Sequence, residues 1–473
     1  MRLAGRAAVI AGAGALTAAL AGLSAPAAAG AGAAAAPAAG SAAALATVTV
    51  QPGVQHVGHG SAQPPTTADC EASFQVACYE PAQIQQAYNL PALYDQGISG
   101  KGATIVIVDS FGSPTIANDL ATFDQQFGLP APPSFKIIRP AGAIPRFDSS
   151  SSQMISWAGE TSLDVEYAHA IAPQASILLV ETPVAETEGV TGFPQIVRAE
   201  EYVINHHLGD VISQSFSATE NTFSARASVN ALRGAYTDAQ RHHITVLAAS
   251  GDSGAADVGL DGQTFYTFPA TSWPASDPLV TGVGGTELVA GKHGYTSVAW
   301  NDTYNKHLGG GTVPYATGGG LSVLFTRPSY QNGVVNVVGR RRGVPDVSMS
   351  GSCTAPVFTY QSYPQYQVPA GWYPSCGTSE ATPEFAGIVA LADQVAGHAL
   401  GVINPTLYKL SAEKAPGIVP VTRGNNTVTF IQNKRKYTIL GFPARAGYSL
   451  ATGVGTVNAW YLAYELAGKT PPK

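Results

Sequence analysis

Two short segments carry the residue types of a hydrolytic site. Residues 376–387 read CGTSEATPEFAG and place Ser379 where a helix is expected to begin, so this serine is either a nucleophile or a helix cap. Residues 159–173 read GETSLDVEYAHAIAP and place Glu160 and Asp164 four residues apart, one turn from each other on a predicted helix. A serine nucleophile needs a base, and a carboxylate can act as one. The two segments are therefore candidates for the nucleophile and the base of one site.

The environment of the acid pair bears on its chemistry. At about 100° per residue, Leu163, Tyr167 and Ile171 fall within roughly 60° of Glu160. We therefore expect Glu160 and Asp164 to be at least partly buried, where two carboxyl groups tend to share a proton and at least one pKa rises. The alternative is that both acids belong to the N-terminal turn of the helix, where they complement its dipole. The spacing alone fits both interpretations equally.

His169 lies on the same predicted helix and is the natural alternative base. Nine residues separate it from Glu160, so its side chain points about 180° away from the acids. We therefore expect a surface or packing histidine.

Asp252 follows a predicted central strand, in the segment AASGDSG at 248–254. The carboxyl end of such a strand is where an α/β sheet presents side chains to its cleft. An acyl-transfer site needs a hydrogen-bond donor for the oxyanion, and a carboxylic acid can donate only while it is protonated. Asp252 is a candidate for this donor, which requires acidic conditions or a raised pKa. Its alternative role is that of a turn-forming aspartate.

Alternating apolar and helical patterns indicate the elements that carry these residues. Continuous apolar, β-branched runs separated by helices are typical of a parallel sheet covered on both faces, which is a doubly wound α/β fold. The predicted strands are 103–110, 175–182, 210–216 and 244–252, and the predicted helices are 160–171, 192–208, 225–243 and a last one that begins near Ser379. Between residues 290 and 370 the chain is rich in Gly, Tyr, Ser and Pro, so loops are expected to dominate there.

The composition indicates an exported globular protein. Of 473 residues, 45% are hydrophobic, which is enough for a sizeable core, and the net charge of -6 argues against nucleic acid as a partner. Residues 1–29 have two arginines, an apolar run and Ala-x-Ala patterns, as in a secretory signal peptide; a membrane anchor is the alternative. Residues 30–69 are rich in Ala, Gly and Pro and are expected to be a linker or short pro-segment. A single folded domain then spans 70–473.

The four cysteines form two neighbourhoods, Cys70 with Cys78 and Cys353 with Cys376. In an oxidising compartment they predict two local disulfides, although other pairings also satisfy the count. Neither neighbourhood has the spacing of a zinc site.

The segment CGTSEATPEFAG resembles the signature Ser-Gly-Thr-Ser-x-x-x-Pro-x-x-Ala-Gly of the sedolisin family, the serine-carboxyl peptidases of subtilisin-like fold. The similarity continues through Glu160 and Asp164 and covers nearly the whole chain from about 80 to 465. Further similar segments are VISQSFS from 211, SGDSG from 250, FPATSWPASDPLVTGVGGTEL from 268, TGGGLSVLFTRPSYQ from 317 and RRGVPDVS from 341. Their joint occurrence makes the resemblance specific.

The resemblance implies a subtilisin-like fold and a role for each candidate residue. Ser379 would be the nucleophile, Glu160 its general base, and Asp164 the group that holds and tunes Glu160. Asp252 would donate to the oxyanion beside the backbone N–H of Ser379. A carboxylate base stays usable at acidic pH, where histidine would be protonated. The implied activity is hydrolysis of protein or peptide substrates through an acyl-enzyme, by a secreted, monomeric endopeptidase or tripeptidyl-type peptidase.

The chain departs from the family at a calcium site near the C-terminus, which in relatives is built from two Asp side chains and backbone carbonyls. Pro420 and Ser449 stand at the two Asp positions, beside the carbonyl positions Val421 and Gly447. Because calcium affinity depends on the number of carboxylates, we expect calcium binding to be weak or absent and no other cofactor. The loop would then be held by direct hydrogen bonds, or by Arg445 in the place of the cation.

Two other functions fit parts of the sequence. A catalytically silent, secreted binding protein of the same fold would explain the altered calcium site, but not the presence of all four candidate site residues. An ordinary subtilisin-like Asp/His/Ser protease would use Asp109, in the segment VIVDS, as its triad aspartate, but the His-Gly-Thr segment of those enzymes is missing. We therefore expect Asp109 to be a structural or supporting residue. Many relatives also carry a long folded prosegment, for which this chain shows only the Ala/Gly-rich stretch.

Overall fold

The apolar runs of the sequence form the central sheet of the computed structural model, which describes residues 55–56, 60–365 and 369–472. Within these residues the sheet has eight strands in the order β10-β9-β7-β5-β2-β4-β3, with β13 also beside β9. The strands are β2 (Thr104–Ser110), β3 (Phe135–Ile138), β4 (Ser176–Thr182), β5 (Val211–Gln214), β7 (Thr245–Ala249), β9 (Thr281–Gly291), β10 (Gly294–Ala299) and β13 (Val347–Ser350). Every pairing is parallel except that of β10 with β9. The prediction of a mostly parallel sheet is therefore confirmed.

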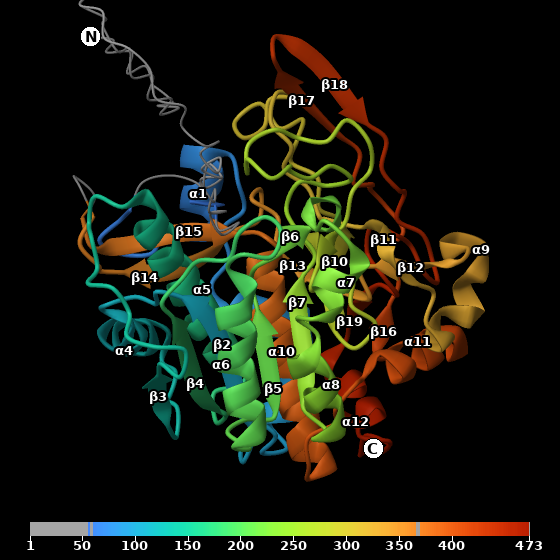
Figure 1. Ribbon diagram of the computed structural model, residues 1–473. Coiled ribbons are helices and arrows are strands. Elements are labelled where there is room, and N and C mark those ends of the chain that lie inside the picture. Colours follow the sequence, from blue (N-terminus) through green and yellow to red (C-terminus); the bar gives the residue numbers. More distant parts are fainter. Residues whose placement is uncertain (1–54, 57–59, 366–368, 473) are drawn as a thin grey trace, which may run out of the picture. The chain divides into compact units, whose positions relative to one another are not determined.

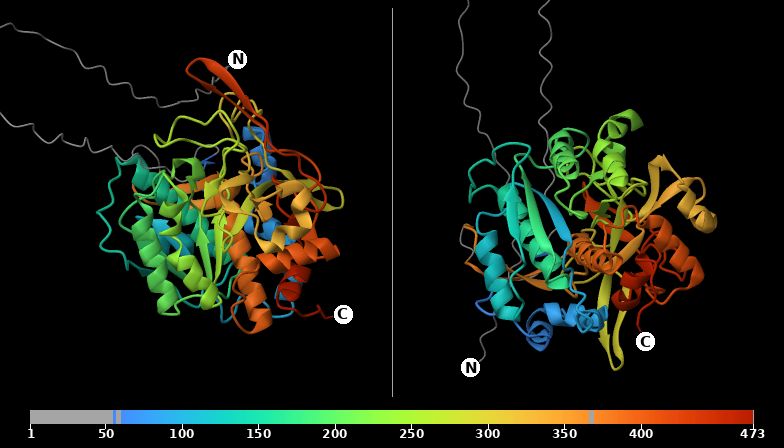
Figure 2. Two further views of the ribbon diagram at one scale, coloured as in Figure 1. Left: turned by 45° about the vertical axis from the view of Figure 1, so that its right-hand side comes forward. Right: turned by 90° about the horizontal axis from the view of Figure 1, so that it is seen from below.

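Helices cover both faces of this sheet. Figure 1 shows the green α6 (Phe193–Asn205) and α8 (Gly234–Arg241) in front of the sheet, with α5 (Ser152–Ile171) and α10 (Thr378–Ala396) behind it; Figure 2 shows the same layers from other sides. In β2, Ile105 and Ile107 pack in the core that contains α5 and α10, whereas Val106 and Val108 pack in the core that contains α6 and α8. Because successive residues of a strand face opposite sides, a strand covered on both faces needs a continuous apolar run. This explains why the strands could be recognised in the sequence.

The remaining helices precede, connect or follow these elements along the chain. They are α1 (Thr67–Phe74), α2 (Pro81–Ala87), α3 (Pro91–Tyr94), α4 (Ile116–Phe127), α7 (Arg226–Asn230), α9 (Val335–Val338), α11 (Asn404–Glu413) and α12 (Ala459–Leu466), with the 3-10 turns η1 (Glu220–Thr222) and η2 (Ser329–Val334). None of the helices that the structure describes combines the length and the apolar character needed to cross a bilayer.

Shorter strands form small sheets and ribbons. They are β1 (Gln55–His56) and β14 (Val357–Gln361) on either side of β15 (Gly371–Cys376), β11 (Gly320–Thr326) with β12 (Arg341–Val344), β16 (Ile418–Val419) with β19 (Thr456–Val457), β17 (Val428–Gln432) with β18 (Arg435–Ile439), and β6 (Ala218–Thr219) with β8 (Ser272–Trp273).

The structure differs from the expected elements in three places. Helix α5 begins at Ser152, eight residues before the predicted start, because the Ser151 hydroxyl caps its first turn. The helix predicted over 225–243 is broken before Gly234 into α7 and α8, and glycine is a weak helix former. Between residues 290 and 370, where loops were expected to dominate, most of the described residues lie outside helices and strands, but the strands β10 to β14 lie there as well. Strands such as β11 are partly exposed, so they lack the continuous apolar run of a central strand.

Both predicted disulfides are present. Cys70–Cys78 joins α1 to the segment before α2, and Cys353–Cys376 joins the residues after β13 to the end of β15. Because α10 starts two residues after Cys376, the second disulfide fixes the entry to that helix.

The expected signal peptide, residues 1–29, lies outside the described residues, as does most of the expected linker. The described part of the expected linker includes β1, which pairs with β15, and the start of α1. This helix begins at Thr67 with a capping box between Thr66 and Asp69. Hydrogen bonds to backbone and capping side chains therefore order this stretch without large apolar side chains.

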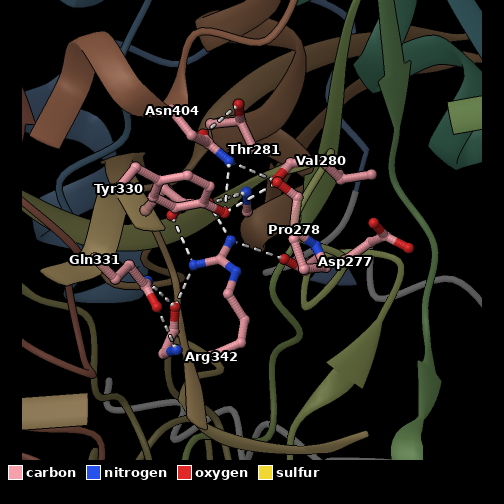
Figure 3. Close-up of polar contacts among 12 residues, drawn as sticks. Asp277, Pro278, Val280, Thr281, Tyr330, Gln331, Arg342 and Asn404 are labelled. Carbon is pink, nitrogen blue, oxygen red and sulfur yellow. Dashed lines mark hydrogen bonds and ion pairs between the residues drawn. The ribbon is translucent and has the colours of Figure 1, made fainter. Parts of the chain in front are cut away.

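A buried ion pair fixes the sheet near α10. The Arg342 guanidinium of β12 donates to Asp346 through Nη1, at 2.7 Å, and also through Nη2. Asp346 in turn accepts the N–H of Gly282 in β9 at 2.8 Å and the hydroxyl of Tyr408 in α11 at 2.9 Å. Figure 3 shows Arg342 beside the ring of Tyr330, whose centroid lies 5.7 Å from the guanidinium carbon. These contacts tie β12, β9 and α11 together, and α10 packs on β9.

Candidate active site

Ser379 is the second residue of α10 and its side chain is buried. The N-cap of the helix is Gly377, which adopts a φ of 123° that favours glycine and offers no side-chain cap. The Gly377 N–H donates to the carbonyl of Gly351 at 2.9 Å, so the turn before the helix lies close against the segment after β13. The alternative that Ser379 is the helix cap is therefore wrong, and its hydroxyl is available for other contacts.

Pro383 lies five residues after Thr378, in the second turn of α10 rather than in the first turn where a proline is best tolerated. Proline has no N–H, so the Ser379 carbonyl lacks the donor that a helix would normally supply from this position. The Ser215 hydroxyl lies 3.5 Å from that carbonyl and donates to Asp164 Oδ1 at 2.8 Å. Ser215 thus connects the helix of the serine to the helix of the acids.

Glu160 and Asp164 are both fully buried within α5, which packs against α10. Because α5 begins at Ser152, Glu160 lies in the third turn, and the alternative of a charge at the helix N-terminus is wrong. Burial raises the pKa of Asp164 well above its usual range, and the neighbouring Asp109 and Glu160 raise it further; the hydrogen bond from Ser215 opposes them. The two acids therefore form a pair that keeps a proton at pH values well above those at which an aspartate normally loses it.

Asp109 is the last residue but one of β2 and interacts with this pair. Its pKa rises to about 7, chiefly because of burial and in part because of Glu181, while Thr161 opposes the shift. Asp109 is also the carboxyl that acts most strongly on Asp164. Where an Asp/His/Ser protease would place a histidine beside its aspartate, the charged neighbours of Asp109 among the described residues are acids. Asp109 is therefore a third member of the acid cluster, in agreement with the expected supporting position.

His169 lies away from the acids, as expected from its position on the helix. Its ring is buried, and Nε2 lies 2.8 Å from the carbonyl of Pro130 and 3.1 Å from a carboxyl oxygen of Asp124. It packs between α5 and α4 and is not placed to act on Ser379.

Asp252 follows β7 and is anchored to the start of α10. Its Oδ1 accepts the N–H of Thr378 at 2.8 Å and the Thr378 hydroxyl at 2.7 Å. Its Oδ2 is enclosed and makes no hydrogen bond to any described residue. Burial raises the pKa of Asp252 to about 6, although Thr378 opposes the shift. Below that pH, Oδ2 can carry a proton, while Oδ1 keeps the carboxyl in place beside the first turn of the helix of Ser379.

Three further carboxyl groups interact with one another and with the candidate base or Asp252, and sequence reasoning missed them. Glu186 follows β4, and burial, then Glu188 and Glu160, raise its pKa well above the usual range. Burial and then Asp257 raise the pKa of Glu188 to about 9, and Asp257 also acts on Asp252. A series of interacting acids thus leads from Glu160 to Asp252. The residues lie in loops without periodicity, so only their proximity in the fold reveals the series.

The positions of the family calcium site are occupied by a hydrogen-bonded turn. The Ser449 hydroxyl accepts the N–H of Thr452 at 3.1 Å, and the backbone groups of Ser449 and Gly453 bond to each other at 2.9 Å in both directions. Arg445 is exposed, so it fills no buried cation position. Over the described ranges, no three His, Cys, Asp or Glu side chains come together in a way that could hold a metal ion. Pro420 and Ser449 supply no carboxylate at this turn, so weak or absent calcium binding stays a prediction.

Known proteins resemble the chain over most of its length. The model of the Peptidase S8 family, the subtilase family, matches residues 155–414. Kumamolisin of Bacillus sp. (strain MN-32) is 32% identical over 387 residues, which cover 80% of this chain and 62% of kumamolisin. Sedolisin of Pseudomonas sp. (strain 101) is 26% identical over 371 residues, which cover 78% of this chain and 59% of sedolisin. The chain thus spans less than two thirds of the length of these relatives.

The fold agrees with that of a solved relative. Pseudomonas sedolisin, a serine-carboxyl proteinase solved with two molecules of pseudo-iodotyrostatin, superposes with a TM-score of 0.64 at 24% identity, covering 82% of this chain and 97% of that chain. This likeness confirms the expected subtilisin-like fold. The family model covers more than half of the chain. The similar proteins kumamolisin and sedolisin indicate the group within that family. The protein belongs to the subtilase family and, within it, is a sedolisin-type member.

Proposed function

We propose that the protein is a secreted, acid-acting serine-carboxyl peptidase that hydrolyses protein or peptide substrates through an acyl-enzyme. The observation that carries the proposal is the setting of Asp252. One of its oxygens is bound to the start of the helix of Ser379, and the other is enclosed, unbonded within the described chain and able to hold a proton below about pH 6. A carboxylic acid in this setting is suited to donate to an oxyanion.

The proposed reaction has two halves. The Ser379 hydroxyl attacks the peptide carbonyl and its proton passes to Glu160, while the oxyanion accepts hydrogen bonds from Asp252 Oδ2 and from the Ser379 N–H. Such an N–H in the first turn of a helix has no partner within the helix. Glu160 then returns the proton to the leaving amine, which departs and leaves the acyl group on Ser379. Water adds to this ester with Glu160 again accepting the proton, and the acid product leaves as Ser379 recovers its hydrogen.

Asp164 acts through Glu160 in this scheme. It shares the buried site with Glu160 and is held by the hydroxyl of Ser215 at 2.8 Å. A second carboxyl that retains its proton can donate to the base and keep it oriented, without adding a second negative charge. Ser215 lies 3.5 Å from the Ser379 carbonyl, so the same hydroxyl also keeps the two helices in register.

Two requirements restrict the activity to acidic pH. Asp252 donates only while protonated, and this form declines as the pH rises through about 6. A carboxylate base, unlike histidine, remains able to accept a proton under the same acidic conditions. Export is supported by the signal-like residues 1–29 and by the two disulfides, which form in oxidising compartments.

The proposal is tested by the pH dependence of kcat/KM on a denatured protein substrate, for the wild type and for Ser379→Ala. We expect activity that increases toward acidic pH in the wild type and is lost in the variant. Circular dichroism shows whether the variant is folded. Activity that increases toward neutral pH, or that survives in a folded Ser379→Ala variant, would contradict the mechanism. Folded protein without activity at any pH would instead support the silent binding protein.

A further inference from the structure

Two glutamates of α10 have no part in the proposed reaction. Glu380 and Glu384 follow Ser379 at one and five residues and are four residues apart, so they lie on one face of the helix, one turn from each other. Both side chains have no exposed surface. A carboxylate without a compensating partner is costly to bury, so a pair at this spacing requires an explanation.

The surroundings of the pair contain acids and hydroxyl groups. The titratable groups that interact with it are Tyr88 after α2, Tyr167 of α5 and Asp252 after β7. The nearby hydroxyl groups belong to Ser350 of β13, beside Glu380, and Thr456 of β19, beside Tyr88. None of the described groups that act on either glutamate is a cation. Neither oxygen of Glu384 makes a hydrogen bond within the described part of the chain.

These surroundings favour the uncharged form of both carboxyl groups. Burial raises the pKa of Glu380 well above its usual range, with Asp252 adding to the shift and the Ser350 hydroxyl opposing it. Burial also raises the pKa of Glu384, and Glu380 adds to it. Because like charges one turn apart repel each other in a medium without water, ionisation of one glutamate further opposes that of the other.

The helix lacks a backbone hydrogen bond where the pair lies. Pro383 lies between the two glutamates in the sequence and removes the hydrogen bond that would hold the Ser379 carbonyl. The first turn of α10 is instead held from outside, by Asp252 on Thr378 and by the disulfide of Cys376. A buried charge that appears in this segment can be relieved only if water enters or the turn moves.

We propose that Glu380 and Glu384 are positioning residues that keep the first turns of α10, and with them Ser379, in place only while both are protonated. The pair would therefore act as an acid-dependent lock on the nucleophile, in addition to the titration of the groups that perform the reaction. The consequence for activity rests on the proposed function, but the consequence for the helix does not.

The sign of the effect follows from the raised pKa values. A group whose pKa is higher in the folded than in the unfolded chain stabilises the fold fully below the unfolded pKa, about 4.3 for glutamate. That stabilisation declines as the pH rises from there through the folded pKa. Each unit of pKa difference corresponds to about a tenfold change in the folding equilibrium.

The test compares amide hydrogen exchange of residues 378–390 in the wild type, Glu380→Gln, Glu384→Gln and the double variant. Glutamine keeps the shape of the side chain and has no charge at any pH. At about pH 4, where the glutamates are uncharged, we expect equal protection in all four proteins. At about pH 7, we expect the segment to exchange at least tenfold more slowly in the double variant than in the wild type at that same pH. Glu413→Gln is the matched control, because Glu413 is exposed and bonded only loosely to Lys409, at 4.0 Å; it should change nothing.

Equal exchange of the wild type and the double variant at both pH values would overturn the proposal. If the double variant does not fold, the exchange of the single variants is measured instead. The infrared band of protonated carboxyl groups is then followed in the wild type as a function of pH. Loss of that band at the pH of ordinary glutamates would equally overturn the proposal. Altered protection without peptidase activity would refute the proposed function and leave the lock intact. Acid-dependent peptidase activity with unaltered protection would refute the lock and leave the proposed function intact.

Discussion

Replacement of Asp252 by asparagine separates the oxyanion donor from the other acids of the site. Asparagine can keep the oxygen that accepts from Thr378, at 2.8 Å from its N–H and 2.7 Å from its hydroxyl, and it replaces Oδ2 by an NH₂ group. This group donates at every pH, whereas the Asp252 carboxyl donates only in its protonated form. The variant should therefore be weakened most at acidic pH and least near neutrality.

The magnitude follows from the pKa of about 6 for Asp252. About nine tenths of the carboxyl is protonated one unit below this pKa, and about one tenth one unit above it. The ratio of kcat/KM for Asp252→Asn to that of the wild type should therefore increase roughly tenfold between about pH 5 and about pH 7. Titration of Glu160 and Asp164 affects both proteins and largely cancels in the ratio. Asp252→Ala, which removes the donor altogether, should lose about a hundred- to a thousandfold at acidic pH.

The assay is the initial rate of cleavage of one quenched fluorescent peptide by both proteins in the same series of buffers. Thermal unfolding in each buffer identifies the pH range in which both proteins are folded, and only that range is used. A ratio that stays constant or falls as the pH increases would refute the assignment of Asp252 as a proton-dependent oxyanion donor. Unchanged activity of Asp252→Ala at acidic pH would refute any direct role of this residue.

Three further changes probe the base, its support and the altered calcium site. Glu160→Gln keeps the shape of the side chain but removes the base, so kcat should fall at least about a hundredfold, and retained activity would exclude Glu160 as the base. Ser215→Ala leaves Asp164 Oδ1 without its donor at 2.8 Å, so urea denaturation should show a free energy of unfolding lower by about 1–3 kcal/mol; an unchanged value would mean that this hydrogen bond adds no stability. Because Pro420 and Ser449 replace the two calcium carboxylates, EGTA should leave both Tm and activity unchanged, and a fall in Tm that calcium reverses would contradict the expected weak or absent site.

The sequence was most informative about elements that are buried on both faces. Strands β2 and β4 are buried at nearly every position, and each has an unbroken run of four apolar residues because both faces of the strand lie under helices. This run makes the strands recognisable without any knowledge of their partners. Helix α10 could be placed because its apolar run follows a glycine and a hydroxyl residue. The start of α5 could not be placed, because the serines before Trp157 fit a loop and a helix cap equally well.

The site residues could be proposed from the sequence, but their surroundings could not. Glu160 and Asp164 share a helix face with Leu163, Tyr167 and Ile171, and these apolar neighbours predicted the burial that the structure shows. The electrostatic interaction of Asp109 with Asp164 and the anchoring of Asp252 by Thr378 depend on strands and helices far apart in the chain. A single sequence has no periodic signal for such contacts, because they form only when the carboxyl ends of several strands meet the start of α10.

The central claim, that Ser379 is the nucleophile of an acid-acting acyl transfer, is tested most directly by trapping the intermediate. An activated peptide ester is mixed with the protein under acidic conditions, the reaction is quenched with acid, and the proteolytic fragments are identified by mass spectrometry. Esters acylate faster than amides, so the acyl-enzyme should accumulate. The account predicts the acyl mass on the fragment that contains Ser379, and its absence in Ser379→Ala. Turnover of the ester without that adduct, or with the acyl group on another residue, would contradict the account.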